Sequence, residues 1–143
     1  MSAEDKAKFG VFGKDGEHIA EKLQYGTPAV APTGTEAIST VVMNDNGAEM
    51  VFAQQAYALL SENDIFIGIS TSGNAENVTL AMEVARVNKA FTIALTGKGG
   101  GKMKDLADVN LIVNDTETYR IHEKHLPIYH LYCMCLENEF YGE

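Results

Sequence analysis

The chain has 143 residues, 45% of them hydrophobic, with 13 glycines and 3 prolines, which suits a globular domain large enough to bury a core. Its formal net charge of −9 argues against a nucleic-acid partner, because no broad basic field is available to neutralise backbone phosphates. No apolar stretch approaches membrane-spanning length, and residues 1–8 lack the apolar segment of a signal peptide, so we expect a single cytoplasmic domain over residues 1–143 without a membrane partner.

Strand-like and helix-like segments alternate along the whole chain. The predicted strands are residues 9–13, 27–32, 65–69, 91–95 and 109–113, and the predicted helices are residues 17–23, 33–43, 48–60, 75–89, 102–107 and 119–140. This alternation is typical of a doubly wound parallel sheet with helices on both faces, a three-layer α/β sandwich of the flavodoxin-like kind. Ligands of such sheets bind outside the carboxyl ends of the strands, where the loops beginning at residues 13, 70 and 96 are expected.

The stretch from Ile65 to Asn74 organises the chain. Its apolar run predicts a buried parallel strand, and the run ends in three hydroxyls, at Ser70, Thr71 and Ser72, just before a predicted helix. Free N–H groups and the positive end of the helix dipole favour an anion there, and the hydroxyls can donate to phosphate oxygens. The pattern equally suits a plain strand–helix turn with a polar cap, so both interpretations stay open.

A second polar loop, residues 96–101, is rich in glycine. Successive backbone N–H groups in such a loop can form an anion-binding nest, and Lys98 could reach a phosphate. Loops of this composition are also common mobile connections, and on composition alone we favour that interpretation.

Three of the four histidines lie in the last predicted helix. His122 and His130 differ by about 80° around a straight helix and could converge loosely, whereas His125 points to the side. Pro127 between them is expected to kink or start the helix. Cys133 and Cys135 are two positions apart, which places them on nearly opposite sides of a helix. This spacing predicts buried free thiols rather than a disulfide.

Three motifs carry a resemblance to a known family. Gly68-Ile-Ser-Thr-Ser-Gly-Asn74 resembles the phosphosugar-binding loop of SIS (sugar isomerase) domains. Leu95-Thr-Gly-Lys-Gly-Gly-Gly-Lys-Met103 and Arg120-Ile-His-Glu-Lys-His-Leu-Pro-Ile-Tyr-His130 are similar to the sedoheptulose 7-phosphate isomerase (phosphoheptose isomerase) branch. The resemblance extends over about residues 9–140.

The resemblance implies a phosphosugar site. Ser70, Thr71 and Ser72 would hold the phosphate, and Asn74 and Arg120 would complete the substrate-binding set. Two positions depart from the branch. Ala75 stands where a further serine is usual, so one hydroxyl is lost, and Tyr119 replaces an acidic residue that helps hold the sugar.

The resemblance also implies zinc, held in this branch by a histidine and a glutamate of the first helix and a glutamine and a histidine of the last. His18 and His130 match the two histidines, and His122 takes the glutamine position. Lys22 takes the glutamate position, with Glu21 beside it as a further candidate ligand. The implied metal ligands are therefore His18, His122 and His130. The implied catalytic residues are His130 as the acid and Glu21 or Lys22 as the base.

Two functions follow as expectations. The first is an aldose–ketose isomerase that converts sedoheptulose 7-phosphate to glycero-manno-heptose 7-phosphate through an enediol. The alternative is a SIS module that binds a phosphosugar or a protein without turnover, which is favoured by Lys22 and by a shortened first loop at residues 14–16. Either form is expected to be a homo-oligomer, a dimer or a tetramer.

Overall fold

The computed structural model describes residues 2–24 and 26–142, which belong to two compact units. One unit comprises residues 31–136, and the other comprises residues 1–30 together with 137–143. Each unit is described separately below. The expectation of one domain over residues 1–143 stays a prediction.

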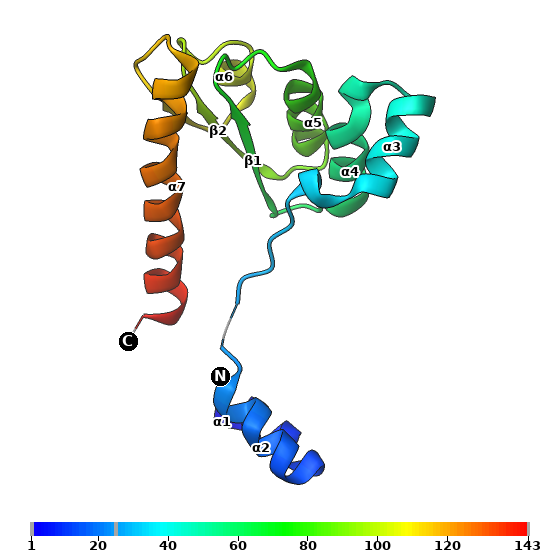
Figure 1. Ribbon diagram of the computed structural model, residues 1–143, viewed down its shortest axis with the longest axis vertical. Helices are drawn as coiled ribbons and strands as arrows, with labels where there is room; N and C mark the ends of the chain where they lie inside the picture. Colours follow the sequence, from blue (N-terminus) through cyan, green and yellow to red (C-terminus); the bar gives the residue numbers. More distant parts are fainter. Residues whose placement is uncertain (1, 25, 143) are drawn as a thin grey trace. The chain divides into compact units, whose positions relative to one another are not determined.

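The larger unit contains a parallel sheet flanked by helices (Figure 1). Its elements are α3 (Glu36–Asp45), α4 (Val51–Leu59), β1 (Ile65–Ser70), α5 (Glu76–Val87), β2 (Phe91–Thr96), α6 (Met103–Leu106), β3 (Val109–Ile112) and most of α7 (Thr118–Tyr141), with short 3-10 helices at Pro32–Gly34 and Ala48–Met50. The strands pair in parallel in the order β1-β2-β3, with Ile65 opposite Phe91 and Ile93 opposite Val109. The predicted α/β class with a parallel sheet is confirmed.

One face of the sheet is covered by α5 and α6. Met82 of α5, Ala94 of β2 and Met103 of α6 are fully buried and form the centre of the core. Gly68 of β1 faces them, and a Cβ there would lie 2.9 Å from Met103 Cε and 3.0 Å from Met82 Sδ. The glycine therefore allows both helices to pack directly on the strand.

Figure 1 shows α7 on the side of the strands opposite α5. The buried residues of α7 are Ile121 and His125, near its amino end. Ile121 lies against Gly97, just beyond β2, and fills the space that a side chain at that position would need. On the same side of the sheet, Ile65, Ile67 and Ile69 of β1 keep 52%, 42% and 48% of their surface exposed, so this contact leaves β1 largely uncovered.

The smaller unit is helical where it has regular structure. It contains α1 (Ala3–Lys8), a 3-10 helix at Phe9–Phe12 and α2 (Gly13–Lys22), and residues 26–30 have no regular secondary structure. The strands predicted at 9–13 and 27–32 are therefore wrong. A run of four or five residues does not distinguish a strand from a helical turn, and Pro28 and Pro32 lack the N–H donors that a ladder requires.

One further expectation needs correction in α7. Cys133 and Cys135 are free thiols, as predicted, but both are exposed because their turns lie beyond the buried residues of this helix. Pro127 lies inside α7, so of its two predicted effects it does not start the helix, and a kink stays a prediction. Within residues 2–24 and 26–142, no helix is long and apolar enough to cross a membrane.

Replacing Met82 tests the core. Met82→Ala removes a fully buried side chain and is expected to lower the free energy of unfolding by about 2–5 kcal/mol. Met134 is 65% exposed, so Met134→Ala is the matched control. It should change the free energy of unfolding by less than about 0.5 kcal/mol. Urea unfolding followed by circular dichroism measures both. Equal losses in the two variants would contradict this description of the core.

Candidate functional site

The predicted hydroxyl loop lies at the carboxyl end of β1 and leads into α5. Ser70 is buried at the end of the strand, and Thr71 and Ser72 are partly exposed in the turn. Helix α5 begins at Glu76 without a side-chain cap on its first turn. None of the hydrogen bonds within residues 2–24 and 26–142 uses the N–H of Glu76 or Asn77. These donors and the loop hydroxyls together form an arrangement suited to an anion.

The glycine-rich loop after β2 packs directly on the hydroxyl loop. Gly97 N–H donates to Thr71 O at 3.1 Å, and Met103 N–H donates to Gly73 O at 3.0 Å. Gly73 has a φ of +66°, and the Gly100 carbonyl occupies the space of its missing side chain. The loop predicted from composition as a plain mobile connection is thus anchored at both of its ends.

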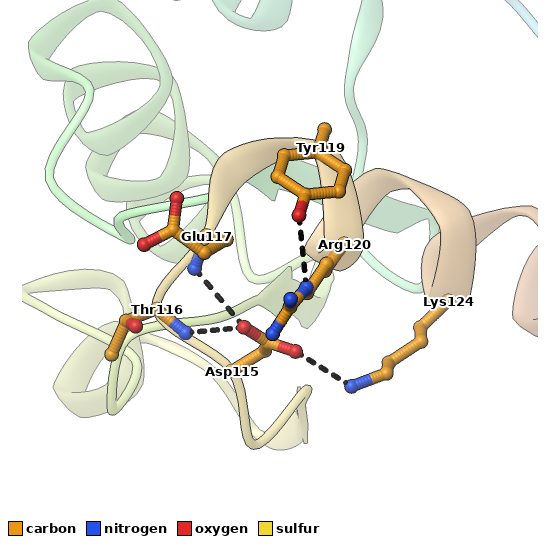
Figure 2. A network of polar contacts seen from close by, with 6 residues as sticks. All are labelled: Asp115, Thr116, Glu117, Tyr119, Arg120 and Lys124. Atoms are coloured by element: carbon orange, nitrogen blue, oxygen red, sulfur yellow. Dashed lines mark hydrogen bonds and ion pairs between the residues drawn. The ribbon is translucent and has the colours of Figure 1, made fainter.

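The amino end of α7 is held on the same edge by Asp115 (Figure 2). Its carboxylate accepts hydrogen bonds from the N–H groups of Thr116 and Glu117, at 2.8 and 3.1 Å. Lys124 Nζ donates to the other oxygen at 2.9 Å. The Lys124 hydrogen bond, with the backbone donors, lowers the pKa of Asp115 from 3.8 to about 2. Lys98 N–H also donates to Asp115 O at 3.1 Å, which ties the glycine-rich loop to α7.

Arg120 has no carboxylate partner in the described part of the chain. Its Nε donates to Tyr119 Oη at 3.1 Å, and the guanidinium lies 5.6 Å from the centre of that ring (Figure 2). A cation held by a neutral phenol keeps its charge available to an anionic ligand. A role for Arg120 in substrate binding stays a prediction.

The histidines of α7 differ in their surroundings. His122 and His130 are exposed, whereas His125 is 2% exposed, with Nε2 3.2 Å from Thr96 O. A carbonyl only accepts, so Nε2–H of His125 is the donor. The ring of His122 packs edge-on against that of His125, with the centroids 6.1 Å apart. His125 therefore ties α7 to the end of β2.

Comparisons with known proteins agree with one another. The SIS domain profile matches residues 38–134. The phosphoheptose isomerase of Aliarcobacter butzleri is 42% identical over 132 residues, which cover 87% of this chain and 70% of that protein. The phosphoheptose isomerase of Helicobacter pylori strain 26695 is 42% identical over 139 residues, which cover 92% of this chain and 72% of that protein.

The chain belongs to the phosphoheptose isomerase family of SIS-domain proteins. A solved relative, the phosphoheptose isomerase GmhA of Neisseria gonorrhoeae, superposes with a TM-score of 0.74 at 36% identity, covering 93% of this chain and 70% of that one. A second, from Francisella tularensis, has a TM-score of 0.77 at 37% identity and covers 85% of this chain and 68% of that one. The predicted family and isomerase class are confirmed.

The residues predicted to bind zinc or to transfer protons belong to both units of this family member. His18, Glu21 and Lys22 lie exposed on α2, with Lys22 Nζ 3.3 Å from Glu21 Oε1. His122 and His130 lie on α7, about 12 Å apart along its axis. Within residues 2–24 and 26–142, no three His, Cys, Asp or Glu residues are arranged to hold a metal ion. The zinc ligand set therefore stays a prediction, and no reaction step is assigned to a metal.

Two residues to which the sequence analysis gave no role support this edge of the family fold, His125 and Asp115. The signal for His125 was its spacing of four residues from the apolar Ile121, which places both on one helix face. The signal for Asp115 was an aspartate in the polar linker before a predicted helix, since aspartate side chains often accept hydrogen bonds from the backbone N–H groups that follow them.

The lowered pKa of Asp115 gives a pH-dependent prediction. Because the pKa is lower in the folded chain, the stabilisation from this carboxylate is complete above pH 3.8 and is lost as the pH falls toward 2. Lys124→Ala removes the largest cause and should move the Asp115 carboxyl titration upward, toward 3.8, in carbon-13 NMR. Lys104→Ala removes a lysine that does not pair with Asp115 and should leave that titration at its wild-type midpoint. An unchanged midpoint in Lys124→Ala would contradict the assignment.

Proposed function

We propose that this chain converts sedoheptulose 7-phosphate to glycero-manno-heptose 7-phosphate. The relatives at about 40% identity are named phosphoheptose isomerases. The observation that carries the proposal is the hydroxyl loop at the start of α5, with uncapped backbone donors beside it. Such a site suits the phosphate of a sugar phosphate.

Local charge supports a phosphate at this edge, although the whole chain carries a net charge of −9. Lys98 and Arg120 have no carboxylate within ion-pair distance among the described residues. Lys98 Nζ is instead 3.4 Å from Thr118 Oγ1, at the start of α7. Cations whose partners are neutral keep their attraction for a dianionic ligand, so we assign Lys98 with Arg120 to the phosphate end of the substrate.

The proposed reaction moves hydrogen between two neighbouring carbons. A base removes a proton from C1 of the ketose while the C2 carbonyl oxygen is protonated, which gives an enediol. The C1 hydroxyl then loses its proton as C2 gains one, and the aldose forms. By resemblance, His130 is the acid that serves the oxygens, and Glu21 or Lys22 is the base. Glu21 is the better candidate by residue type, because glutamate is the residue that the family has at the base position.

Loss of the Thr71 hydroxyl tests the phosphate site. Thr71→Val keeps the side-chain shape and is expected to raise KM for sedoheptulose 7-phosphate by about 10-fold or more, because hydrogen bonds to charged groups contribute about 1.5–3 kcal/mol. Thr40→Val makes the same chemical change on α3, where Thr40 Oγ1 donates to Glu36 O, and should leave KM unchanged. The aldose product is followed by NMR. A normal KM in Thr71→Val would contradict the assignment.

The same assay separates catalysis from binding alone. His130→Ala is expected to lose turnover while a thermal shift with the phosphosugar persists. If the wild-type chain shows the thermal shift but no turnover, the function is that of a phosphosugar-binding SIS module, the alternative that Lys22 favours. If it shows neither, the phosphosugar proposal fails.

Zinc on His18, His122 and His130 stays a prediction of the resemblance and is tested by metal analysis. The purified chain should contain zinc at close to one equivalent, because these histidines would be its ligands. His122→Ala and His130→Ala should each lose most of the metal. Asn138→Ala, an exposed change two turns farther along α7, is the control and should retain it. If all variants contained the same amount of zinc, the assignment of the histidines as its ligands would be wrong.

A further inference from the structure

The side chain of Asn74 connects the two loops of the site. Its Oδ1 accepts a hydrogen bond from Lys102 N–H at 3.0 Å, across 28 positions of sequence. Its Nδ2 donates to Ser72 O at 3.1 Å, and its own backbone N–H donates to Ser72 Oγ at 3.1 Å. One amide thus bonds to the backbones of the hydroxyl loop and of the glycine-rich loop.

We propose that Asn74 is a positioning residue that holds the glycine-rich loop against the hydroxyl loop and so presets the phosphate site. The residue type fits this role because an amide offers a donor and an acceptor at one position. A carboxylate could not donate to Ser72 O, and a single hydroxyl is too short to span both backbones. Asn74 therefore acts on the substrate through Ser72 and through the loop that carries Lys98.

The neighbouring contacts show why a further hydrogen bond between the two loops is needed at Asn74. Between the two loops, Gly97 N–H donates to Thr71 O and Met103 N–H donates to Gly73 O. These bonds lie at the two ends of the glycine-rich loop, and residues 98–101 between them all have positive φ. Glycines lose the most conformational entropy when they are ordered, so a side-chain bond beside them limits that cost.

The partner of Asn74 can be removed from the opposite loop. Lys102 has a φ of −63°, which is the value that proline fixes. Lys102→Pro therefore deletes the backbone N–H that donates a hydrogen bond to Asn74 Oδ1. Lys102→Ala removes the same charge and keeps the N–H, which makes it the matched control.

The test compares Asn74→Ala, Lys102→Pro and their double variant. Each single variant is expected to raise KM for sedoheptulose 7-phosphate by about 2- to 10-fold, with kcat changed less, because the loops must be ordered when the substrate binds. The double variant should be no worse than Asn74→Ala, because both changes break the same bond. Lys102→Ala should keep the wild-type KM. Asn88→Ala should keep it too, because this asparagine lies at the carboxyl end of α5, away from the hydroxyl loop, where its Nδ2 donates to Leu60 O.

Hydrogen exchange without substrate provides a second readout. Amide exchange over residues 97–103 should accelerate in Asn74→Ala and in Lys102→Pro, and not in the two controls. This measurement does not depend on the proposed isomerase activity. It can therefore show whether the positioning role of Asn74 is wrong even if the proposed isomerase function is wrong too. The proposal is overturned if Asn74→Ala raises KM while exchange stays normal, or if Lys102→Pro leaves both at wild-type values.

Discussion

The candidate site depends on the close contact of two loop backbones at the carboxyl edge of the sheet. Gly73 and Gly100 meet where neither tolerates a side chain, and hydrogen bonds close the contact on either side of them. Backbone groups that pair in this way are satisfied without water, so the hydroxyls and the first N–H groups of α5 are left to face a ligand. Core packing sets the loops at this distance, because Gly68 lets Met103 and Met82 lie directly on β1.

Helix α7 is joined to this edge by three kinds of interaction. Ile121 provides apolar packing on Gly97, His125 provides a buried hydrogen bond to Thr96 O, and Asp115 provides a charged hydrogen bond with Lys124. The packing and the buried bond bring α7 to the end of β2, and the Asp115 carboxylate joins the segment before α7 to Lys124 of the helix. Arg120, one residue before Ile121, is consequently carried close to the glycine-rich loop.

The charge distribution of the chain agrees with a small anionic ligand. A net charge of −9 disfavours large polyanions, yet a site built from backbone donors, hydroxyls and two cations needs only local complementarity. The family relationship and this edge of the sheet point to the same substrate class. The departures from the family pattern at Lys22 and Ala75 concern positions to which the resemblance assigns the base and one phosphate contact, and neither residue takes part in the hydrogen bonds between the two loops given above.

The sequence by itself determined the α/β class, the three strands of the sheet, the hydroxyl loop and the family, because buried apolar runs and short polar motifs are local patterns. It wrongly predicted strands at 9–13 and 27–32, where local pattern is ambiguous and prolines remove ladder donors. Only the tertiary structure decided that the glycine-rich loop is anchored, that His125 is buried and that Cys133 and Cys135 are exposed. It also assigned Asn74 its partner, Lys102, 28 positions away. These properties depend on which segments meet in space, and contacts between distant segments leave no periodic signal in the chain.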